Sequence, residues 1–359
     1  MVDRSTAALV SALGVIAPGR PLREGLDRIL QANKGALILV GDGADTLEIC
    51  SGGLLLDAEF SPQRLSELAK MDGAIILAAD ASRIARANVH LVPSPVVPTT
   101  ETGTRHRTAE RVARSIDVPV VAVSEDMGVI TMYRGGHKHP LESIPRLLGR
   151  ANQALQTLER YRHRLDTVTN ALSSLEIEDL VTVRDVVAVL QRAEMVSRIA
   201  DEVTGYVVEL GSDGRLVHLQ LEELMAGVED DRRHVIRDYL RGPTPAVVDS
   251  AVRGLHEMST ETLLDVKAVA ALLHLSGGDE ALDPDASVQP VGYRLLAKVP
   301  RLAESMIRKI VTRYGNLQDI LAATVDDLDG VDGVSRQTAS TVKEGLSRLA
   351  ETSILDRYS

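Results

Sequence analysis

The stretch TGTRHRTAERVARSIDVPVVAVSE, residues 102–125, holds a polar turn, a helical segment and an apolar strand in succession. Its first part has a turn glycine, a hydroxyl at the expected helix N-cap, and Arg105 and Arg107 on either side of His106. A helix start offers unpaired backbone N–H groups and a positive dipole end, so it favours a bound anion. Two guanidinium groups fit a polyphosphate, because each can bind phosphate oxygens as a fork. The alternative is an exposed basic helix start that pairs with nearby acids.

Strands and helices alternate on both sides of this stretch, which predicts an α/β domain over residues 1–140 with a central mixed or largely parallel sheet. Helical spacing of apolar residues predicts helices within residues 1–30, and Ser61-Pro62 marks the start of another helix. Sites in such folds form where strands end and helices begin. Short apolar runs closed by turn residues predict strands within residues 35–43, 54–56, 70–77, 88–93, 118–125 and 129–136.

The composition, 44% hydrophobic and 25% charged residues, is that of a soluble globular protein. A length of 359 residues predicts two or three domains. One Phe, seven Tyr and no Trp indicate aliphatic cores and argue against nucleic-acid binding by aromatic stacking. The net charge of −11 argues against general coating of nucleic acid, so any such contact must come from a local patch.

Cysteine usage and hydropathy predict where the protein works. Cys50 is the single cysteine, so an internal disulfide is excluded and a buried, inert thiol is expected. No apolar run reaches membrane-spanning length, and the N-terminal residues do not resemble a signal peptide. We therefore expect a cytoplasmic protein, a location that includes the nucleoid.

Two common nucleotide-binding loops are absent from the sequence: there is neither a G-x-x-x-x-G-K-[ST] loop nor a G-x-G-x-x-G turn. Instead, Asp72 and Gly73 enter the strand expected within residues 70–77. Asp72 is either a plain turn residue or a metal ligand, since Gly73 lets a ligand approach the backbone. His90 lies among apolar neighbours, which is more typical of a structural than of a catalytic histidine.

Two motifs, in this order, resemble those of the diadenylate cyclase family. Asp72-Gly73-Ala74 matches its Asp-Gly-Ala motif, and Arg105-His106-Arg107 follows about thirty residues later as its Arg-His-Arg motif. Residues 88–91 and 122–125 also look like this family. The whole chain is similar to the form of the cyclase that carries a helical middle and a DNA-binding C-terminus.

The resemblance implies that two ATP molecules condense into cyclic di-AMP with release of two pyrophosphates. Each step is attack of a ribose 3′-hydroxyl on an α-phosphate, which depends on positioning and charge neutralisation. Asp72 would hold a Mg²⁺ or Mn²⁺ ion that activates the hydroxyl, and His106 would lie near the phosphates without acting as a general base. The implied catalytic residues are Asp72, Arg105, His106 and Arg107. The implied ATP-binding residues are Asp72, Gly73, Leu91, Gly103, Thr104, Arg105, His106, Arg107, Thr108 and Ser124.

The two-fold symmetry of cyclic di-AMP has a consequence for assembly. The simplest catalyst is a pair of identical domains, each with one ATP, that face each other across a two-fold axis. Oligomerisation is therefore expected to be required for activity. The family implies a homo-octamer with cyclase domains face to face.

Residues 141–285 predict a helical spine. Apolar or nearly apolar residues recur at steps of four and three from Leu147 to Leu172, a period typical of a long core helix or of a coiled coil between protomers. His137-Lys138-His139, at the join to the first domain, is either a metal site or a solvated basic turn. Further helices are expected near residues 178–204 and 230–275, a hairpin-like turn at 206–215 and a linker at 277–285.

Residues 286–359 predict short helices joined by tight turns, and residues 328–339 resemble a helix-hairpin-helix motif, whose turn N–H groups bind a DNA phosphate. Gly333 matches the first glycine of the motif. Ser335 stands where the second is expected, and a positive φ there would cost roughly 1 kcal/mol. The implied DNA-binding residues are Gly333, Val334, Ser335 and Arg336, with a second hairpin at 299–310 and with Arg294, Arg301, Arg308, Lys309 and Lys343 beside a backbone groove. The alternative is a helical domain for protein interactions.

Two functions follow from this organisation. The first is a diadenylate cyclase whose output reports the state of branched or damaged DNA, bound without sequence specificity. The second is a non-catalytic, ATP-sensing scaffold for DNA repair that binds branched DNA. They differ at Asp72, because chemistry needs a metal ligand beside the Arg-His-Arg motif and a sensor does not. No membrane partner is expected.

Overall fold

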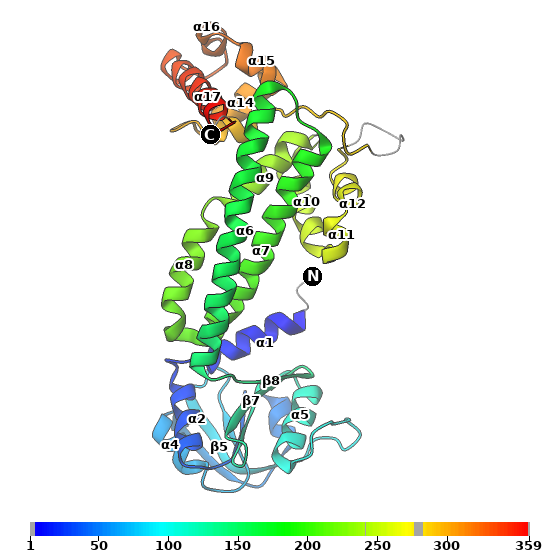
Figure 1. Cartoon of the computed structure of the whole chain (residues 1–359). Coiled ribbons are helices and arrows are strands. Elements are labelled where there is room, and N and C mark those ends of the chain that lie inside the picture. Colours follow the sequence, from blue (N-terminus) through cyan, green and yellow to red (C-terminus); the bar gives the residue numbers. More distant parts are fainter. Residues whose placement is uncertain (1–3, 241, 276–282, 358–359) are drawn as a thin grey trace. The chain divides into compact units, whose positions relative to one another are not determined.

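The computed structural model describes residues 4–240, 242–275 and 283–357 (Figure 1). Contacts divide the chain into two compact units. The sheet unit comprises residues 1–154 and 202–220, and the helical unit comprises residues 155–201 and 221–359. The fold class agrees with the prediction, because an α/β region with a mixed sheet precedes long helices.

The sheet unit is built on one eight-stranded sheet in the order β2-β5-β4-β1-β6-β7-β8, with β3 also paired to β5. Its strands are β1 (Ala36–Val40), β2 (Cys50–Ser51), β3 (Leu54–Glu59), β4 (Ala74–Leu77), β5 (Arg83–Leu91), β6 (Val120–Ser124), β7 (Val129–Arg134) and β8 (His137–Pro140). Its helices include α1 (Arg4–Val15), α2 (Pro21–Gln31), α3 (Ala44–Glu48), α4 (Pro62–Leu68) and α5 (Thr104–Ser115). Each of the predicted strand regions therefore contains a strand.

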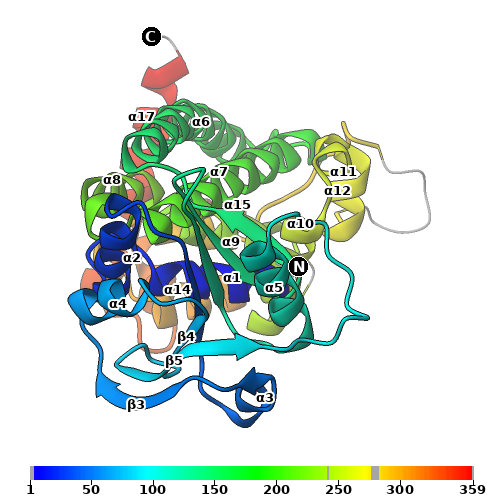
Figure 2. The ribbon, with the colours of Figure 1, turned by 90° about the horizontal axis from the view of Figure 1, so that it is seen from below.

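The two faces of the sheet are covered by different helices, because successive side chains of a strand point to opposite faces. In β1, Ile38 packs in a core cluster that includes residues of α1, α2 and α4. Its neighbours Leu37 and Leu39 pack in a second cluster with Ala109 and Val112 of α5. Figure 2 shows α2 and α4 on one side of the sheet and α5 on the other. The aliphatic core expected from the composition is thus split into two layers.

The pairing of the strands decides which ends meet at one edge. β1 and β4 are parallel to each other, and the other pairs within the described residues are antiparallel. The expectation of a largely parallel sheet was therefore wrong, and the mixed alternative holds. Because β5 and β6 run against β4 and β1, the carboxyl ends of β5 and β6 lie at the edge where β4 and β1 begin.

The hairpin-like turn expected at residues 206–215 is absent. Helix α7 (Val183–Leu210) continues through Tyr206, and a short 3-10 helix (Gly211–Gly214) leads into α8 (Arg215–Met225). Gly211 ends α7 because it adopts a left-handed φ of 52°, and an added Cβ there would lie 2.3 Å from the Pro18 carbonyl oxygen. None of the helices in the described residues combines the length and the apolar composition that a membrane span requires.

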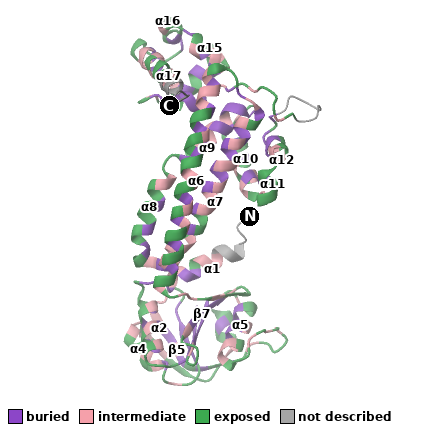
Figure 3. Cartoon of the chain, viewed as in Figure 1, coloured by how far each residue is buried: buried purple, intermediate pink, exposed green. Residues whose placement is uncertain are grey.

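The spine consists of long helices, as predicted. Helix α6 (Ile144–Glu178) carries the 3.5-residue apolar pattern, and Figure 3 shows buried and exposed residues alternating along it. Leu147, Ala151, Leu158, Leu165 and Leu172 are buried within the chain itself, which favours a core helix over a coiled coil between protomers at these positions. The other helices are α9 (Val228–Tyr239), α10 (Pro245–Glu257), α11 (Thr260–Leu264) and α12 (Val266–Leu272). Most of the expected linker at 277–285 lies outside the described residues.

Residues 286–357 form two helical hairpins around one core. The helices are α13 (Tyr293–Ala297), α14 (Glu304–Tyr314), α15 (Leu317–Ala322), α16 (Val325–Asp329) and α17 (Arg336–Arg357). The turns between α13 and α14 and between α16 and α17 each contain a left-handed residue, Arg301 at φ 62° and Gly333 at φ 80°. Ser335 has no positive φ, and its hydroxyl accepts a hydrogen bond from the Thr338 N–H at the start of α17. The expected strain at Ser335 therefore does not arise.

Arg294 does not lie beside a groove, which corrects the sequence-based expectation. Its side chain is fully buried and forms an ion pair with the equally buried Glu176 of α6. Tyr239 donates a hydrogen bond to the same carboxylate at 2.7 Å. Asp238 accepts the backbone N–H of Arg294 at 2.9 Å. A charged side chain in an apolar core needs such partners, and here they come from distant helices.

Candidate functional site

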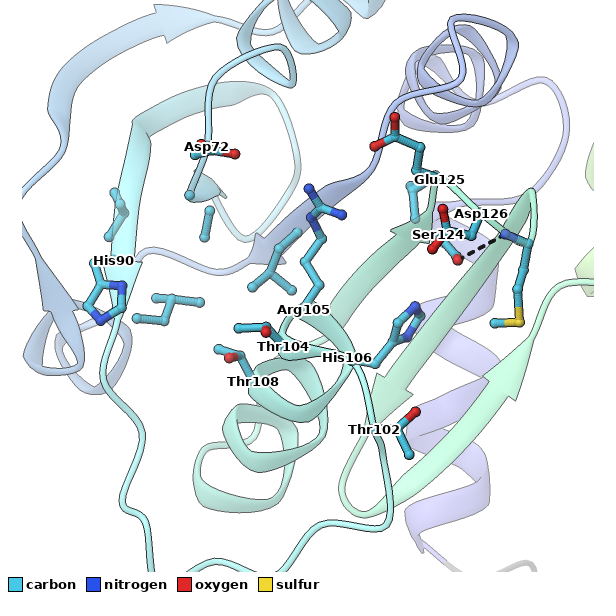
Figure 4. Close-up of a pocket in the computed structure, with 18 residues that line it drawn as sticks. Asp72, His90, Thr102, Thr104, Arg105, His106, Thr108, Ser124, Glu125 and Asp126 are labelled. Atoms are coloured by element: carbon cyan, nitrogen blue, oxygen red, sulfur yellow. Dashed lines mark hydrogen bonds between the residues drawn. The ribbon is translucent and has the colours of Figure 1, made fainter.

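A cavity of about 670 Å³ opens at the edge where β1 and β4 begin and β5 and β6 end. The first turn of α5 closes one side of it, and the β6–β7 turn closes another. Its lining residues are Leu37, Asp72, Gly73, Ala74, Val89, His90, Leu91, Thr102, Gly103, Thr104, Arg105, His106, Thr108, Val123, Ser124, Glu125, Asp126 and Met127. Figure 4 shows Asp72 and Arg105 approaching this space from different elements.

Nine of the ten predicted ATP-binding residues line this cavity, and Arg107 does not. Arg107 is exposed, so the two arginines of the motif differ in environment. The helix begins at Thr104 with Gly103 as N-cap, and no side chain caps it. The expected N-cap hydroxyl was therefore wrong. Because the first backbone bond of the helix is from Arg107 N–H to the Gly103 carbonyl, the N–H groups before it lack helical partners.

Asp72 and Gly73 form the turn that enters β4. The Asp72 carboxylate is exposed at the cavity, and the described part of the chain offers it no hydrogen bond or ion pair. Gly73 has a φ of 97°, a conformation that favours glycine. An added Cβ would lie 2.8 Å from the carbonyl carbon of Asn88 and 3.0 Å from the Val89 nitrogen. Gly73 therefore lets the turn into β4 lie against the backbone of β5 at Asn88 and Val89.

Replacing Gly73 with alanine is expected to destabilise the sheet unit by roughly 2 kcal/mol and to distort the cavity. The backbone of β5 would have to shift, since main-chain atoms rather than a flexible side chain meet the new Cβ. Calorimetric unfolding of the full chain measures the loss. Gly149→Ala is the control, because its Cβ would meet nothing within 4 Å and it lies in α6. Equal unfolding temperatures for the two variants would contradict this account.

The guanidinium of Arg105 lies beside a second glycine, Gly35. An added Cβ on Gly35 would lie 2.1 Å from a terminal nitrogen of Arg105, so the guanidinium lies against the backbone that leads into β1. Arg105 thus brings a positive charge to the cavity beside the backbone of Gly35. The sequence contains both residues, but nothing in their spacing indicates this contact.

A strap at residues 92–103 carries the chain from β5 to α5 and is tied to that helix. The buried Glu110 carboxylate accepts the Thr99 hydroxyl at 2.5 Å and the Thr100 N–H at 2.9 Å. Arg111 donates to the Val97 carbonyl at 3.0 Å. Burial raises the pKa of Glu110, but the hydrogen bonds from Thr99 and Thr100 outweigh it, so the pKa lies below its ordinary value. The carboxylate thus stays ionised and holds the strap.

Sequence reasoning did not assign several cavity residues. Asp126 and Met127 come from the β6–β7 turn, and Leu37 and Val89 add apolar surface. The sequence indicated Asp126 and Met127 only in part, because they follow Ser124 and the acid after it at the end of an apolar strand. His90 lines the cavity as well, at the end of β5.

The tripeptide His137-Lys138-His139 belongs to strand β8 rather than to a basic turn. Lys138 pairs with Glu101 at 2.6 Å, and His139 lies 3.1 Å from Glu209 of α7. The described residues contain no group of three His, Cys, Asp or Glu side chains placed to hold a metal ion. The metal-site alternative for this tripeptide therefore has no support.

Cys50, half-buried, donates to the Thr46 carbonyl at 3.1 Å, and burial raises its pKa.

Comparison with known proteins gives consistent matches. The family model described as DisA bacterial checkpoint controller nucleotide-binding matches residues 23–138, and the one described as DisA bacterial checkpoint controller linker region matches residues 141–282. DNA integrity scanning protein DisA of Frankia alni is 56% identical over 97% of both chains. Its counterpart from Kineococcus radiotolerans is 55% identical over 100% of both. Among solved structures, DacA from Staphylococcus aureus aligns with a TM-score of 0.29 and 24% identity over 39% of this chain and 91% of its own.

Proposed function

Because this chain belongs to the family of the DNA integrity scanning protein DisA, we propose that it is a diadenylate cyclase. It condenses two ATP molecules into cyclic di-AMP and releases two pyrophosphates. The observation that carries the proposal is the cavity that brings Asp72, at the start of β4, to the same space as the first turn of α5. Incubation with ATP and Mn²⁺, followed by chromatography, tests it. Absence of cyclic di-AMP from the wild-type reaction would refute the cyclase and leave the ATP-sensing scaffold.

The first turn of α5 is the proposed triphosphate site. Its unpaired N–H groups and dipole favour an anion, and Arg105 adds a full positive charge at the same place. The hydroxyls of Thr104 and Thr108 lie on the same lining and can donate to phosphate oxygens. Apolar side chains of Leu37, Val89 and other strand residues provide a surface for the adenine ring.

Asp72 fits a divalent metal ion as the family pattern implies. Mg²⁺ and Mn²⁺ take oxygen ligands, and Mg²⁺ is commonly bound by one or two carboxylates together with substrate phosphates. An exposed carboxylate with no partner among the described residues meets that requirement. Bound there, the metal would supply charge neutralisation and a lower pKa for the attacking 3′-hydroxyl. Asp72 would hold that ion at the cavity that the phosphate-binding turn also lines.

The two-fold symmetry of cyclic di-AMP is the basis for the oligomeric assembly that we propose. One cavity belongs to one chain, whereas ring closure joins two nucleotides by two equivalent steps, so two cavities must face each other. We expect a homo-oligomer, an octamer by analogy with the family. Arg107 is exposed and does not line the cavity, so we propose that it serves a nucleotide held by the facing chain.

The two arginines of the motif are therefore expected to differ on mutation. Arg105→Ala should weaken binding of ATP about 100-fold, because it removes a charge-assisted contact inside the cavity. Arg107→Ala should change ATP affinity less than about two-fold and lower turnover of the assembled enzyme. Calorimetric titration with 3′-deoxy-ATP measures affinity without turnover, and the rate of cyclic di-AMP formation measures turnover. Equal losses of affinity in the two variants would contradict the distinction.

The hairpin turns of residues 299–302 and 330–335 are the proposed DNA site. Both turns hold a left-handed residue, Arg301 and Gly333, ahead of a helix start. Lys309 lies beside the second turn, 2.9 Å from the Asp332 carbonyl oxygen. Backbone N–H groups and nearby cations suit a DNA phosphate, and they read no base sequence.

Charge reversal at this site is expected to weaken DNA binding. Arg301→Glu combined with Arg336→Glu should lower affinity for a four-way junction at least ten-fold and reduce the salt dependence of binding, since fewer counterions are released. Mobility shifts at two salt concentrations measure both effects. Arg184→Glu, an exposed arginine outside the hairpins, is the matched control. Unchanged binding by the double variant would move the DNA site elsewhere.

A further inference from the structure

A network of side chains lies directly behind the proposed phosphate-binding turn. The Tyr133 hydroxyl, on β7, donates to a Glu101 carboxylate oxygen at 3.0 Å and lies 2.9 Å from Nδ1 of His106. Lys138, on β8, pairs with the same Glu101 oxygen at 2.6 Å. Tyr133 is 1% exposed and the Glu101 side chain 13% exposed, so these polar groups depend on one another.

The number of available protons fixes how these groups are connected. A tyrosine hydroxyl has one proton, and the Glu101 carboxylate can only accept. With that proton directed to Glu101, the Tyr133 oxygen must accept from His106, so the neutral His106 ring carries its proton on Nδ1. Its Nε2 is then an acceptor, and this atom is buried with no partner among the described residues.

The electrostatics around His106 agree with a neutral ring. Burial lowers its pKa most; Glu101 opposes this effect, while Lys138 and Arg105 add to it. Tyr133 also remains protonated, because burial and Glu101 raise its pKa. Since Nδ1 is engaged and Nε2 is shielded from solvent, the ring is poorly placed to remove a proton from a ligand. His106 therefore acts through its position in the fold.

The network encloses the turn on both sides. Glu101 immediately precedes Thr102 and Gly103, and His106 lies in the first helical turn after them, so one hydroxyl holds both flanks. The Glu101 main chain is held as well, because its N–H donates to the Thr99 hydroxyl at 3.1 Å. Among the described residues, Tyr133 is the one sheet residue whose side chain contacts both Glu101 before the turn and His106 after it.

We propose that Tyr133, together with Glu101 and Lys138, is the positioning group of the nucleotide site, which clamps the turn between Glu101 and His106 in the shape that receives phosphate. The inference rests on the proposed nucleotide-binding function of this cavity. It assigns Tyr133, Glu101 and Lys138 a role in the site although none of them lines the cavity.

Tyr133→Phe tests the clamp, because it removes the hydroxyl and keeps the buried ring. Affinity of the full-length protein for 3′-deoxy-ATP, which cannot react, should fall about ten-fold. Tyr206→Phe is the matched control, since its hydroxyl also bonds a glutamate in the sheet unit, at 2.6 Å, away from the cavity. The control should keep wild-type affinity. An affinity for Tyr133→Phe within two-fold of wild type would overturn the proposal.

Glu101 variants separate positioning from general loss of structure. Glu101→Ala should also lose about ten-fold, and the double variant with Tyr133→Phe should be no weaker, because both changes release the same clamp. Glu101→Gln keeps an acceptor for the hydroxyl and should recover most of the affinity. A hundred-fold loss in the double variant would show independent roles and refute the clamp.

The same titrations distinguish a failure of this inference from a failure of the cyclase proposal. If wild type binds 3′-deoxy-ATP and forms no cyclic di-AMP from ATP, the cyclase fails, and the affinities of the variants still decide the clamp. If wild type binds no adenine nucleotide, the clamp is refuted together with the site it serves. Unfolding temperatures of Tyr133→Phe and Tyr206→Phe that agree show that the loss of affinity is local.

Discussion

Asp72→Asn is expected to lower cyclic di-AMP formation by roughly three orders of magnitude. The substitution keeps the size of the side chain and removes the negative charge that would hold the metal opposite the phosphate-binding turn. The carboxylate has no partner among the described residues, so its loss should leave the fold intact. Product quantified by chromatography at saturating ATP and Mn²⁺ gives the rate, and added chelator should abolish the wild-type rate.

Asp45→Asn is the control for this result, because Asp45 is an exposed acid of the same unit that does not line the cavity. It should retain the wild-type rate. Binding of ATP without metal should survive in Asp72→Asn, since Arg105 and the helix start remain. Equal product from Asp72→Asn and wild type would exclude Asp72 as the metal ligand.

Glu176→Gln is expected to destabilise the helical unit by about 3–5 kcal/mol, the largest structural effect that a single substitution should have here. The change leaves the Arg294 guanidinium buried without its counter-charge, and both side chains are fully buried. Tyr239 donates a hydrogen bond to the same Glu176 carboxylate, and Asp238 accepts the backbone N–H of Arg294 in α13. Hydrogen exchange of the amides in α13 measures the local loss and should show faster exchange.

An exposed ion pair of the same unit provides the comparison. Asp285 pairs with Arg184 at 3.0 Å, and both side chains are more than half exposed. Asp285→Asn should therefore cost at most about 1 kcal/mol, because water already solvates both charges. If the two substitutions changed stability equally, burial would not be the source of the strength of the Glu176 contact.

Local patterns in the sequence determined most of the elements. The step of four and three from Leu147 to Leu172 predicted α6, and apolar runs closed by turn residues predicted the strands. These predictions succeed because helical and strand periods are properties of neighbouring residues. One exception was residues 206–215, where a Gly-Ser-Asp-Gly sequence indicated a hairpin. The close approach of Pro18 to Gly211 gave instead a short 3-10 helix between two longer ones.

The candidate site was likewise predicted from the sequence only in part. Asp72-Gly73-Ala74 and Arg105-His106-Arg107 were apparent in the sequence as short motifs, and the fold brings Asp72 and Arg105 to one cavity. The exposure of Arg107 could not be read from the motif, because it depends on which side of α5 faces the strand ends.

Tertiary structure alone decided the contacts that join residues far apart in the chain. Glu101 meets Tyr133 across 32 residues, and Arg294 meets Glu176 across 118. Sequence patterning identified Arg294 only as a basic residue near a hairpin, whereas its fully buried position follows from the packing of α6 and α9 around it. The sequence around a single charged residue does not show whether its side chain is buried, and burial determines whether that side chain binds DNA, holds a fold together or shapes a site. The sequence thus determined the elements and the motifs, and the packing of distant elements decided which side chains those motifs depend on.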